Sequence, residues 1–444
     1  MNAVRLVARR YYIKTLGCKV NRVESDTLAS ELFANGCNPS DEASADVIII
    51  NTCTVTSEAD TKVRKAVRHA LAANDQAIVI ATGCATYYAG ETLAHMDTRV
   101  KIVGDKSMLL NEVLAAFSSV DACANDKSVS GSRRTVGAAH EVPAEIRAAD
   151  GELGLRTRTP IKIQDGCDNF CSFCVISRVR GPVWSASVDE VVSSVVRADA
   201  PEVILTGINL ARFCDPATNE DLASLVNRLT ALAGPRIRLS SIEPPDLQPR
   251  LLDALSSSYV APHLHVPLQS GSDAVLSAMG RKYTTDEYLT WITRAKEAIA
   301  NLTITTDVIV GFPGETEEDF EQTLAFCERV GFSKIHVFKY SPREHTPAAT
   351  FEKQVDPMVK NERALRLREV SEALRGQFMA HLGLGPAAQS REEKRSFDVV
   401  VESVGPQSAR GTSGEYIQLE FAPISVVAPG DRVIVSASQV LEST

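Results

Sequence analysis

The sequence lacks the long apolar run that a membrane span requires. A spanning helix needs about 18 or more consecutive apolar residues, and the longest runs here, such as Val47 to Ile50, are only as long as a strand. The N-terminus holds three arginines but lacks the apolar stretch of a secretory signal. We therefore expect a cytoplasmic protein that has no membrane partner.

The chain also lacks an excess of basic residues. Lys and Arg number 47 against 56 Asp and Glu, so the formal net charge is -9. This balance disfavours a protein that holds nucleic acid by bulk positive charge. With 44% hydrophobic residues, the chain has enough apolar material for a sizeable core, which excludes wholesale disorder. Its 444 residues predict about three domains.

Cysteine, in contrast, is plentiful, with ten residues. In a reducing compartment, clustered cysteines indicate metal binding or catalysis more often than disulfides.

The hydrophobic pattern predicts an α/β protein with three structured regions. Residues 1–117 alternate strands and helices, as expected of a parallel-sheet α/β domain. Residues 118–155 read as a linker, and residues 156–382 hold a second series of six strands with intervening helices, which predicts a partial (α/β)6 barrel. Residues 383–444 show short strands between Gly, Pro and Ser turns, which predicts a small antiparallel β-barrel.

The sharpest local signal is the spacing Cys-x3-Cys-x2-Cys formed by Cys167, Cys171 and Cys174. Three thiolates on one short loop can hold three corners of a cubane iron–sulfur cluster, leaving the fourth iron without a protein ligand. An open iron can bind a small chelating molecule. The alternatives are a zinc site and buried structural thiols, but a structural zinc site takes four ligands, and no second cysteine pair or histidine follows nearby.

Three further cysteines, Cys18, Cys53 and Cys84, each follow a predicted strand. Because parallel strands end at one edge of a sheet, the loops that carry these cysteines are expected along that edge. Gly17 and Gly83 would let the backbone approach closely. On this basis the three thiols form a second three-ligand cluster site, and the alternative is three unrelated buried cysteines.

Together these motifs resemble the radical S-adenosylmethionine (SAM) methylthiotransferase family. The matching stretches are TLGCKVN, NTCTVT, ATGC and the Cys-x3-Cys-x2-Cys loop, and the resemblance runs from about Tyr12 to Ser438. It implies that Cys167, Cys171 and Cys174 hold a [4Fe-4S] cluster that binds and cleaves SAM. It also implies that Cys18, Cys53 and Cys84 hold a second [4Fe-4S] cluster, which takes part in sulfur delivery. The C-terminal region resembles the family's RNA-binding TRAM domain.

The ending of TLGCKVN resembles the branch that acts on N6-threonylcarbamoyladenosine at tRNA position 37. The resemblance therefore implies a tRNA anticodon loop as partner, together with a reducing electron donor and a sulfur donor. The alternatives are N6-isopentenyladenosine in tRNA, an aspartate of a ribosomal protein, and a non-catalytic iron–sulfur RNA-binding protein. From residue 389 onward there are five basic and eight acidic residues, which argues against strong phosphate-driven RNA binding by the C-terminal region.

Four further residues are candidates for cofactor binding: Phe173, Gly207, Glu243 and Gln269. Phe173 precedes the third cysteine of the loop, where the superfamily often has an aromatic residue. The other three lie at or after predicted strand ends, where α/β barrels place their chemistry. His265 reads as an ordinary core histidine. The triplet Arg281-Lys282-Tyr283 reads either as an RNA contact or as a surface patch.

Overall fold

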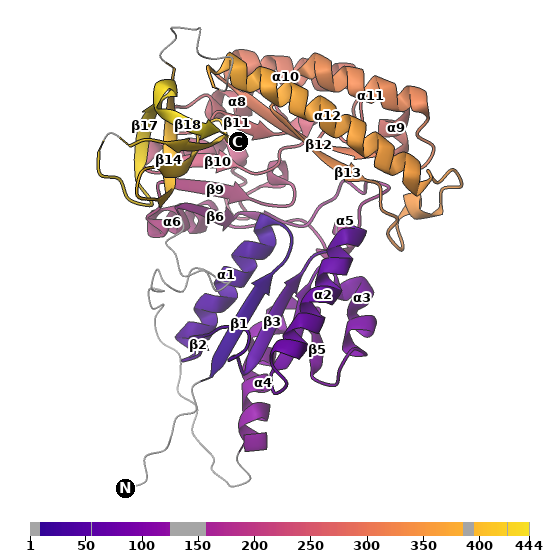
Figure 1. Ribbon diagram of the computed structural model, residues 1–444, viewed down its shortest axis with the longest axis vertical. Helices are drawn as coiled ribbons and strands as arrows, with labels where there is room; N and C mark the ends of the chain where they lie inside the picture. The colour runs from indigo at the N-terminus through magenta and orange to yellow at the C-terminus, as the bar shows by residue number, and fades with distance from the viewer. Residues whose placement is uncertain (1–8, 55, 125–156, 385–394, 424, 444) are drawn as a thin grey trace. The chain divides into compact units, whose positions relative to one another are not determined.

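The computed structural model describes residues 9–54, 56–124, 157–384, 395–423 and 425–443. The chain divides into two compact units, Met1–Leu155 and Arg156–Thr444 (Figure 1). Within the described residues, no helix is long and apolar enough to cross a membrane.

The first unit is a five-stranded parallel sheet in the order β2-β1-β3-β4-β5. Its elements are β1 (Arg10–Thr15), α1 (Lys19–Ala34), β2 (Asn38–Pro39), β3 (Val47–Thr52), α2 (Ser57–Ala73), β4 (Ile78–Gly83), α3 (Thr86–Ala94), β5 (Val100–Val103) and α4 (Leu109–Ala124). Alternate residues of β3 pack on opposite faces: Ile49 contacts the core beneath α1 and α4, and Ile48 contacts the core beneath α2 and α3. Burial of both faces explains the continuous apolar run of β3.

The predicted α/β domain at the N-terminus is therefore confirmed. Helix α4 continues to Ala124, which is beyond the predicted start of the linker at residue 118. The rest of that predicted linker, up to residue 155, lies outside the described residues, and the proposed domain boundaries stay predictions.

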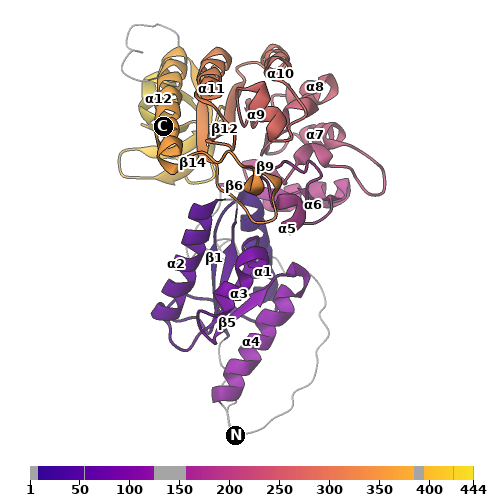
Figure 2. The same cartoon turned by 90° about the vertical axis from the view of Figure 1, so that its right-hand side faces the viewer.

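The second unit holds six parallel barrel strands in two three-stranded sheets, β10-β9-β6 and β11-β12-β13. A parallel bridge between Ser241 and His265 joins the sheets. The elements are β6 (Arg158–Lys162), β7 (Gln164–Asp165), α5 (Ile176–Val179), β8 (Trp184–Ser185), α6 (Val188–Ala198), β9 (Glu202–Thr206), α7 (Leu222–Ala231), β10 (Arg236–Leu239), α8 (Pro249–Leu255), β11 (His263–His265), α9 (Asp273–Ala278), α10 (Thr285–Ala298), β12 (Thr303–Val310), α11 (Glu317–Val330), β13 (Lys334–Lys339) and α12 (Pro357–His381). Figure 2 shows the helices of this unit in an arc outside its strands, as predicted for a partial (α/β)6 barrel.

The C-terminal part of this unit is a five-stranded antiparallel sheet in the order β17-β14-β15-β16-β18. Its strands are β14 (Ser396–Val404), β15 (Ala409–Ser413), β16 (Gln418–Phe421), β17 (Arg432–Ser436) and β18 (Val440–Ser443). Its core includes Met379 and Leu382 at the end of α12. The predicted antiparallel C-terminal fold is confirmed.

The turn after β15 is bonded to the barrel strands. Buried Glu202 accepts hydrogen bonds from Arg236 Nε (2.6 Å) and Arg238 Nε (2.8 Å). Arg238 also donates to the carbonyls of Ser413 (3.0 Å) and Gly414 (3.1 Å). Burial raises the pKa of Glu202, but the two guanidinium groups outweigh it and hold the pKa at about 2. The ionised carboxylate therefore holds the two arginines whose guanidinium groups join the barrel strands to the C-terminal sheet.

Candidate cysteine-based active site

The three N-terminal cysteines lie where the parallel strands end. Cys18 follows β1 and is the N-cap of α1, Cys53 follows β3, and Cys84 follows β4. In the doubly wound order 2-1-3-4-5, ligands bind outside the carboxyl ends of the strands, at the switch point between β1 and β3. Cys18 is exposed, while Cys53 and Cys84 are buried. The fold thus brings the loops of these predicted ligands to one sheet edge.

A hydrogen-bond network of motif residues holds the three loops together. Asn21 Nδ2 donates to the carbonyls of Leu16 (2.8 Å) and Thr52 (2.9 Å), which joins the first loop to the second. Thr52 Oγ1 donates to the Thr82 carbonyl (2.6 Å), and the Cys84 amide donates to the Thr52 carbonyl (3.1 Å), which joins the second loop to the third. The motifs therefore contain the residues that position the cysteines as well as the cysteines themselves.

Two glycines of these motifs allow close approach. Gly17 has φ +95°, and a Cβ at this position would lie 2.7 Å from Cys53 Sγ. Gly83 has φ +92°, and a Cβ there would lie 2.5 Å from Asn51 Oδ1. Both positions combine left-handed backbone with lack of space, so only glycine fits without a shift. The direct contact of Gly17 with Cys53 shows that the first two loops meet.

The loop with Cys167, Cys171 and Cys174 follows β7 and precedes α5. Gly166 begins it with φ +75°, and a Cβ there would lie 2.1 Å from the Pro182 carbonyl oxygen. Phe170 also has positive φ (50°) and is 73% exposed. The backbone is thus folded into a shape that ordinary residues rarely adopt, and such conformations are common at functional sites.

Ser172 anchors the middle of this loop to other segments. Its amide donates to the Met279 carbonyl (2.9 Å), and its Oγ donates to the Ala278 carbonyl (2.8 Å). Its carbonyl accepts from the Ala348 amide (2.9 Å). Since Ser172 lies directly after Cys171, these bonds fix the position of that cysteine.

The cysteines of this loop lie in a poorly hydrated environment. Burial raises the pKa of the Cys174 thiol to about 12 and also raises the pKa of Cys167. Without a metal the two sulfurs therefore remain protonated at neutral pH, whereas metal coordination deprotonates a thiol. A soft, three-thiol donor set in such surroundings fits an iron–sulfur cluster that leaves one iron open.

Arg281 is a site residue that sequence analysis did not assign to the cysteine loop. Its Nη1 donates to Cys171 Sγ (3.3 Å), and its Nη2 pairs with Glu243. Its Nε donates to the Tyr283 hydroxyl (3.1 Å). The RNA-contact hypothesis for this triplet is wrong for Arg281 and Tyr283, because their side chains are only 4% and about 6% exposed. Glu243, a predicted cofactor ligand, thus faces the cluster loop through Arg281.

Gly207 has no side chain, and this leaves room for the side chain of Gln164. The Gln164 side chain accepts from the amides of Ile208 (3.0 Å) and Asn209 (2.8 Å). Its Nε2 donates to the Gly166 carbonyl (2.8 Å). A Cβ on Gly207 would lie 2.9 Å from Gln164 Oε1. Gln164 therefore couples the cluster loop to the turn after β9, and sequence analysis missed it because a lone glutamine carries no motif signal.

Phe173 and Gln269 also lie at the carboxyl ends of the strands. Phe173 packs edge-on against Phe312, with ring centroids 6.4 Å apart. Gln269 has φ +69°, and its amide donates to the Asp307 carbonyl (2.9 Å). Phe173 therefore lies beside the loop after β12 and Gln269 lies beside β12 itself, and their cofactor roles stay predictions.

The comparisons agree with this arrangement at the level of domains. Residues 161–327 match the family model described as "Radical SAM superfamily". Residues 10–104 match the one described as "Uncharacterized protein family UPF0004". A solved radical S-adenosylmethionine methyltransferase, TsrM from Kitasatospora setae, has the same general fold, with a TM-score of 0.54 at 14% identity over 77% of each chain.

Among sequence relatives, the chain is 37% identical over 372 residues to the threonylcarbamoyladenosine tRNA methylthiotransferase MtaB of Bacillus subtilis, covering 82% of this chain and 80% of the relative. It is 33% identical to the protein of the same name from Chlamydia pneumoniae, over 96% of this chain and 95% of the relative. It is 32% identical to a tRNA-2-methylthio-N(6)-dimethylallyladenosine synthase of Magnetococcus marinus, over 82% of this chain and 83% of the relative.

The partial barrel and its three-cysteine loop thus define a radical SAM enzyme, whose cofactors are an iron–sulfur cluster and SAM. Similarity over nearly the whole chain makes the identification more specific. The chain belongs to the radical SAM methylthiotransferase family.

Proposed function

We propose that the protein adds a methylthio group to C2 of N6-L-threonylcarbamoyladenosine at position 37 of tRNA. The observation that carries this proposal is the similarity to four MtaB proteins at 33–37% identity over 80–96% of the chain. Relatives named tRNA-2-methylthio-N(6)-dimethylallyladenosine synthase are similar at 32–34% identity. The identities of 37% and 36% to the MtaB proteins of Bacillus subtilis and Aquifex aeolicus lie above this range, and together with the TLGCKVN ending they support the threonylcarbamoyl branch.

In this proposal Cys167, Cys171 and Cys174 hold the cluster that binds SAM, and Cys18, Cys53 and Cys84 hold a second cluster. When bound, the first cluster supplies the electron that cleaves SAM, and the second supplies a site for sulfur. Arg281 places positive charge against the sulfur of Cys171, which stabilises the more negative, reduced state of the cluster.

In this proposal the remaining site residues bind SAM or orient the backbone that binds it. Gln164 fixes the turn of Gly207 so that its backbone is available to the amino group of SAM. Glu243 balances the charge of Arg281, and its carboxylate is 22% exposed, so it can also accept from a cofactor hydroxyl. The proposal requires a reducing electron donor and a sulfur donor. Its tRNA partner would present a base from the single-stranded anticodon loop, which can be splayed into a pocket.

Nucleoside mass analysis of tRNA from a deletion strain tests the proposal. We expect 2-methylthio-N6-threonylcarbamoyladenosine to disappear, its unthiolated precursor to accumulate, and the gene to restore the product. The Cys171→Ala variant should fail to restore it. Unchanged levels of this nucleoside would contradict the proposal, and loss of the methylthio-isopentenyl nucleoside would assign the enzyme to the other branch.

A further inference from the structure

The inner face of the barrel is polar on the strands β11, β12 and β13. Alternate residues of these strands belong to the core that packs against the helices, namely Leu264, Ile304, Val308 and Ile335. Since successive side chains of a strand point to opposite faces, the residues between them point into the barrel. Those residues are His265, Thr305, Asp307 and His336.

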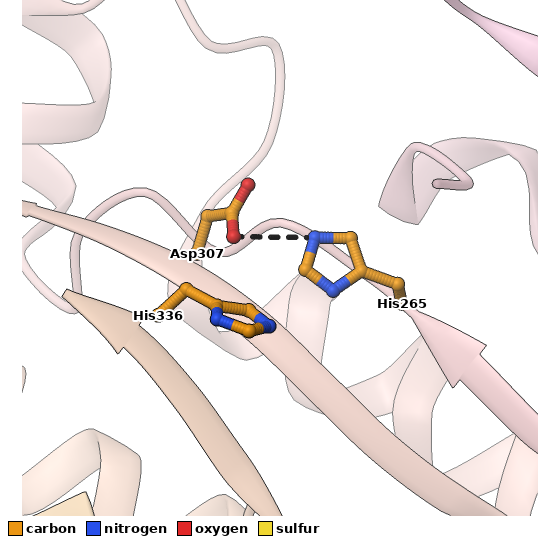
Figure 3. Close-up of side chains that lie close together, drawn as sticks. All are labelled: His265, Asp307 and His336. Atoms are coloured by element: carbon orange, nitrogen blue, oxygen red, sulfur yellow. Dashed lines mark ion pairs between the residues drawn. The ribbon is translucent and has the colours of Figure 1, made fainter. Parts of the chain in front are cut away.

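Three of these inward side chains meet in one cluster (Figure 3). His265 Nε2 lies 3.3 Å from an oxygen of Asp307, and Asp307 is the register partner of His336. The rings of His265 and His336 have centroids 5.6 Å apart. Each residue contributes a nitrogen or oxygen atom, and these atoms all lie within 4.8 Å of one another. All three side chains are only half-buried, so the cluster remains accessible.

The cluster adjoins an open space with polar walls. Thr305 Oγ1 contacts the rings of both His265 (2.9 Å) and His263 (3.0 Å). The same threonine lines a cavity of about 740 Å³. The charged residues that line this cavity are Arg158, Lys334, Arg368, Arg375, Glu372 and Glu415, four basic against two acidic. Arg158 is paired with Glu402 (2.7 Å), and the rest of the lining carries three basic against two acidic residues, so the space is polar and weakly positive.

Tyr416, in the turn between β15 and β16, lines this cavity. Its ring stacks on His263 with centroids 4.5 Å apart, and Arg238 lies 5.0 Å from the ring centroid. Tyr416 has φ +68°, a conformation that a bulky residue rarely adopts. The ring is therefore held in place by its surroundings and forms part of the cavity wall.

We propose that His265, Asp307 and His336 bind the threonyl part of the N6 substituent of the substrate base. This inference rests on the proposed function. The substituent carries a carboxylate, a hydroxyl group and amide N–H groups. The histidine rings can donate to the carboxylate or hydroxyl oxygen, Asp307 can accept from an N–H, and the weakly positive cavity lining attracts the carboxylate. In this role the three side chains bind the substituent only by hydrogen bonds and charge, and no covalent bond to them forms or breaks.

The same cluster disfavours the isopentenyl substituent. That group is a hydrocarbon, so it would displace water from the histidine rings and the carboxylate without replacing the lost hydrogen bonds. A polar site rejects a ligand that lacks its polar groups strongly, because the site's own donors and acceptors are left unpaired. His265, Asp307 and His336 would therefore determine which modified adenosine the enzyme accepts.

The test measures binding of anticodon stem–loop RNA to the reconstituted holoenzyme in the presence of SAM. Three RNAs carry N6-threonylcarbamoyladenosine, N6-isopentenyladenosine or unmodified adenosine at position 37. We expect the wild type to bind the first about tenfold more tightly than the third. His336→Phe and Asp307→Asn should lose this preference while keeping their affinity for unmodified RNA. His381→Gln, at an exposed position of α12, is the matched control and should keep the preference.

The Asp307→Asn change is close to isosteric, so it keeps the test interpretable if His336→Phe fails to fold. Retained preference in folded Asp307→Asn and His336→Phe proteins would overturn the inference. So would a stoichiometric divalent metal, beyond the cluster iron, that both variants lose. A wild type that methylthiolates the threonylcarbamoyl RNA but shows no binding preference would contradict this inference alone. A wild type that modifies only the isopentenyl RNA would contradict the proposed function.

Discussion

The two cysteine sites differ in how their cysteines are spaced along the chain. Cys167, Cys171 and Cys174 lie within eight consecutive residues, whereas Cys18, Cys53 and Cys84 are separated by 35 and 31 positions. The first site depends on the shape of a single loop, which Gly166 and Ser172 fix. The second depends on three loops that a parallel sheet brings to one edge.

Because of this difference, the two sites should be disrupted by different kinds of substitution. The three cysteines of the single loop are close together in the chain. Changes in packing elsewhere in the protein should therefore leave them close together. The three-loop site depends on contacts between loops, such as those of Asn21 and Thr52. A substitution that separates the loops should therefore remove that site without touching a cysteine.

The largest effects should come from removing one cysteine of each site. Cys171→Ala should abolish SAM cleavage, because the cluster proposed to deliver the electron would lose a ligand next to Arg281. Cys53→Ala should keep SAM cleavage but lose methylthio transfer. Detection of 5′-deoxyadenosine and of the modified nucleoside measures the two outcomes. SAM cleavage in Cys171→Ala, or its loss in Cys53→Ala, would contradict the separate roles.

Gly17→Ala should disrupt the three-loop site by forcing a Cβ to within 2.7 Å of Cys53 Sγ. We expect loss of about half of the bound iron, with SAM cleavage retained. Gly36→Ala is the matched control, since Gly36 has φ +76° but nothing lies within 4 Å of its added Cβ. It should cost about 1–2 kcal/mol of backbone strain and keep its iron. Equal iron loss in both variants would show that strain, not contact with Cys53, is responsible.

Gly166→Ala makes the corresponding change in the single-loop site. Its added Cβ would lie 2.1 Å from the Pro182 carbonyl oxygen, so the loop must shift. We expect SAM cleavage to fall by at least about tenfold, because the cluster ligands are displaced. Gly181→Ala, with φ +74° and no atom within 4 Å, should retain most of the activity. Wild-type cleavage rates in the Gly166→Ala variant would contradict the role of this turn.

A smaller effect is expected from Arg281→Gln. Removal of the positive charge 3.3 Å from Cys171 should lower the reduction potential of the SAM-binding cluster. The shift should be on the order of tens of millivolts, and the potential of the N-terminal cluster should not change. Redox titration followed by electron paramagnetic resonance measures both. Arg178→Gln, at an exposed position on α5, is the control, and an equal shift in it would argue against a local effect.

The sequence predicted the six barrel strands and the strands that precede the cysteines because each is a short apolar run between turn residues. In the C-terminal region, β15 (Ala409–Ser413) has no such run, because its buried Thr412 and Ser413 give no apolar signal. Thr412 is buried because its Oγ1 donates to Glu402 (2.8 Å), and this bond depends on the register of β14 and β15. Such contacts arise only after the strands have paired.

The same limit applies to the site. The cysteines were predicted from spacing and motif, whereas Arg281 and Gln164 act through neighbours 110 and 44 to 45 positions away in the chain. From the sequence alone His265 reads as a core histidine, because its partners Asp307 and His336 lie on other strands. The register of β11, β12 and β13 brings them together, and no local pattern encodes that register.

The iron content of matched triple variants tests the central claim, two separate cluster sites, most directly. The reconstituted wild type should hold about eight irons per chain, as expected for two [4Fe-4S] clusters. Replacing Cys18, Cys53 and Cys84 with Ala should leave about four, and replacing Cys167, Cys171 and Cys174 should also leave about four, each with the spectrum of the remaining cluster. A wild type with only about four irons, or a triple variant that keeps them all, would contradict the account.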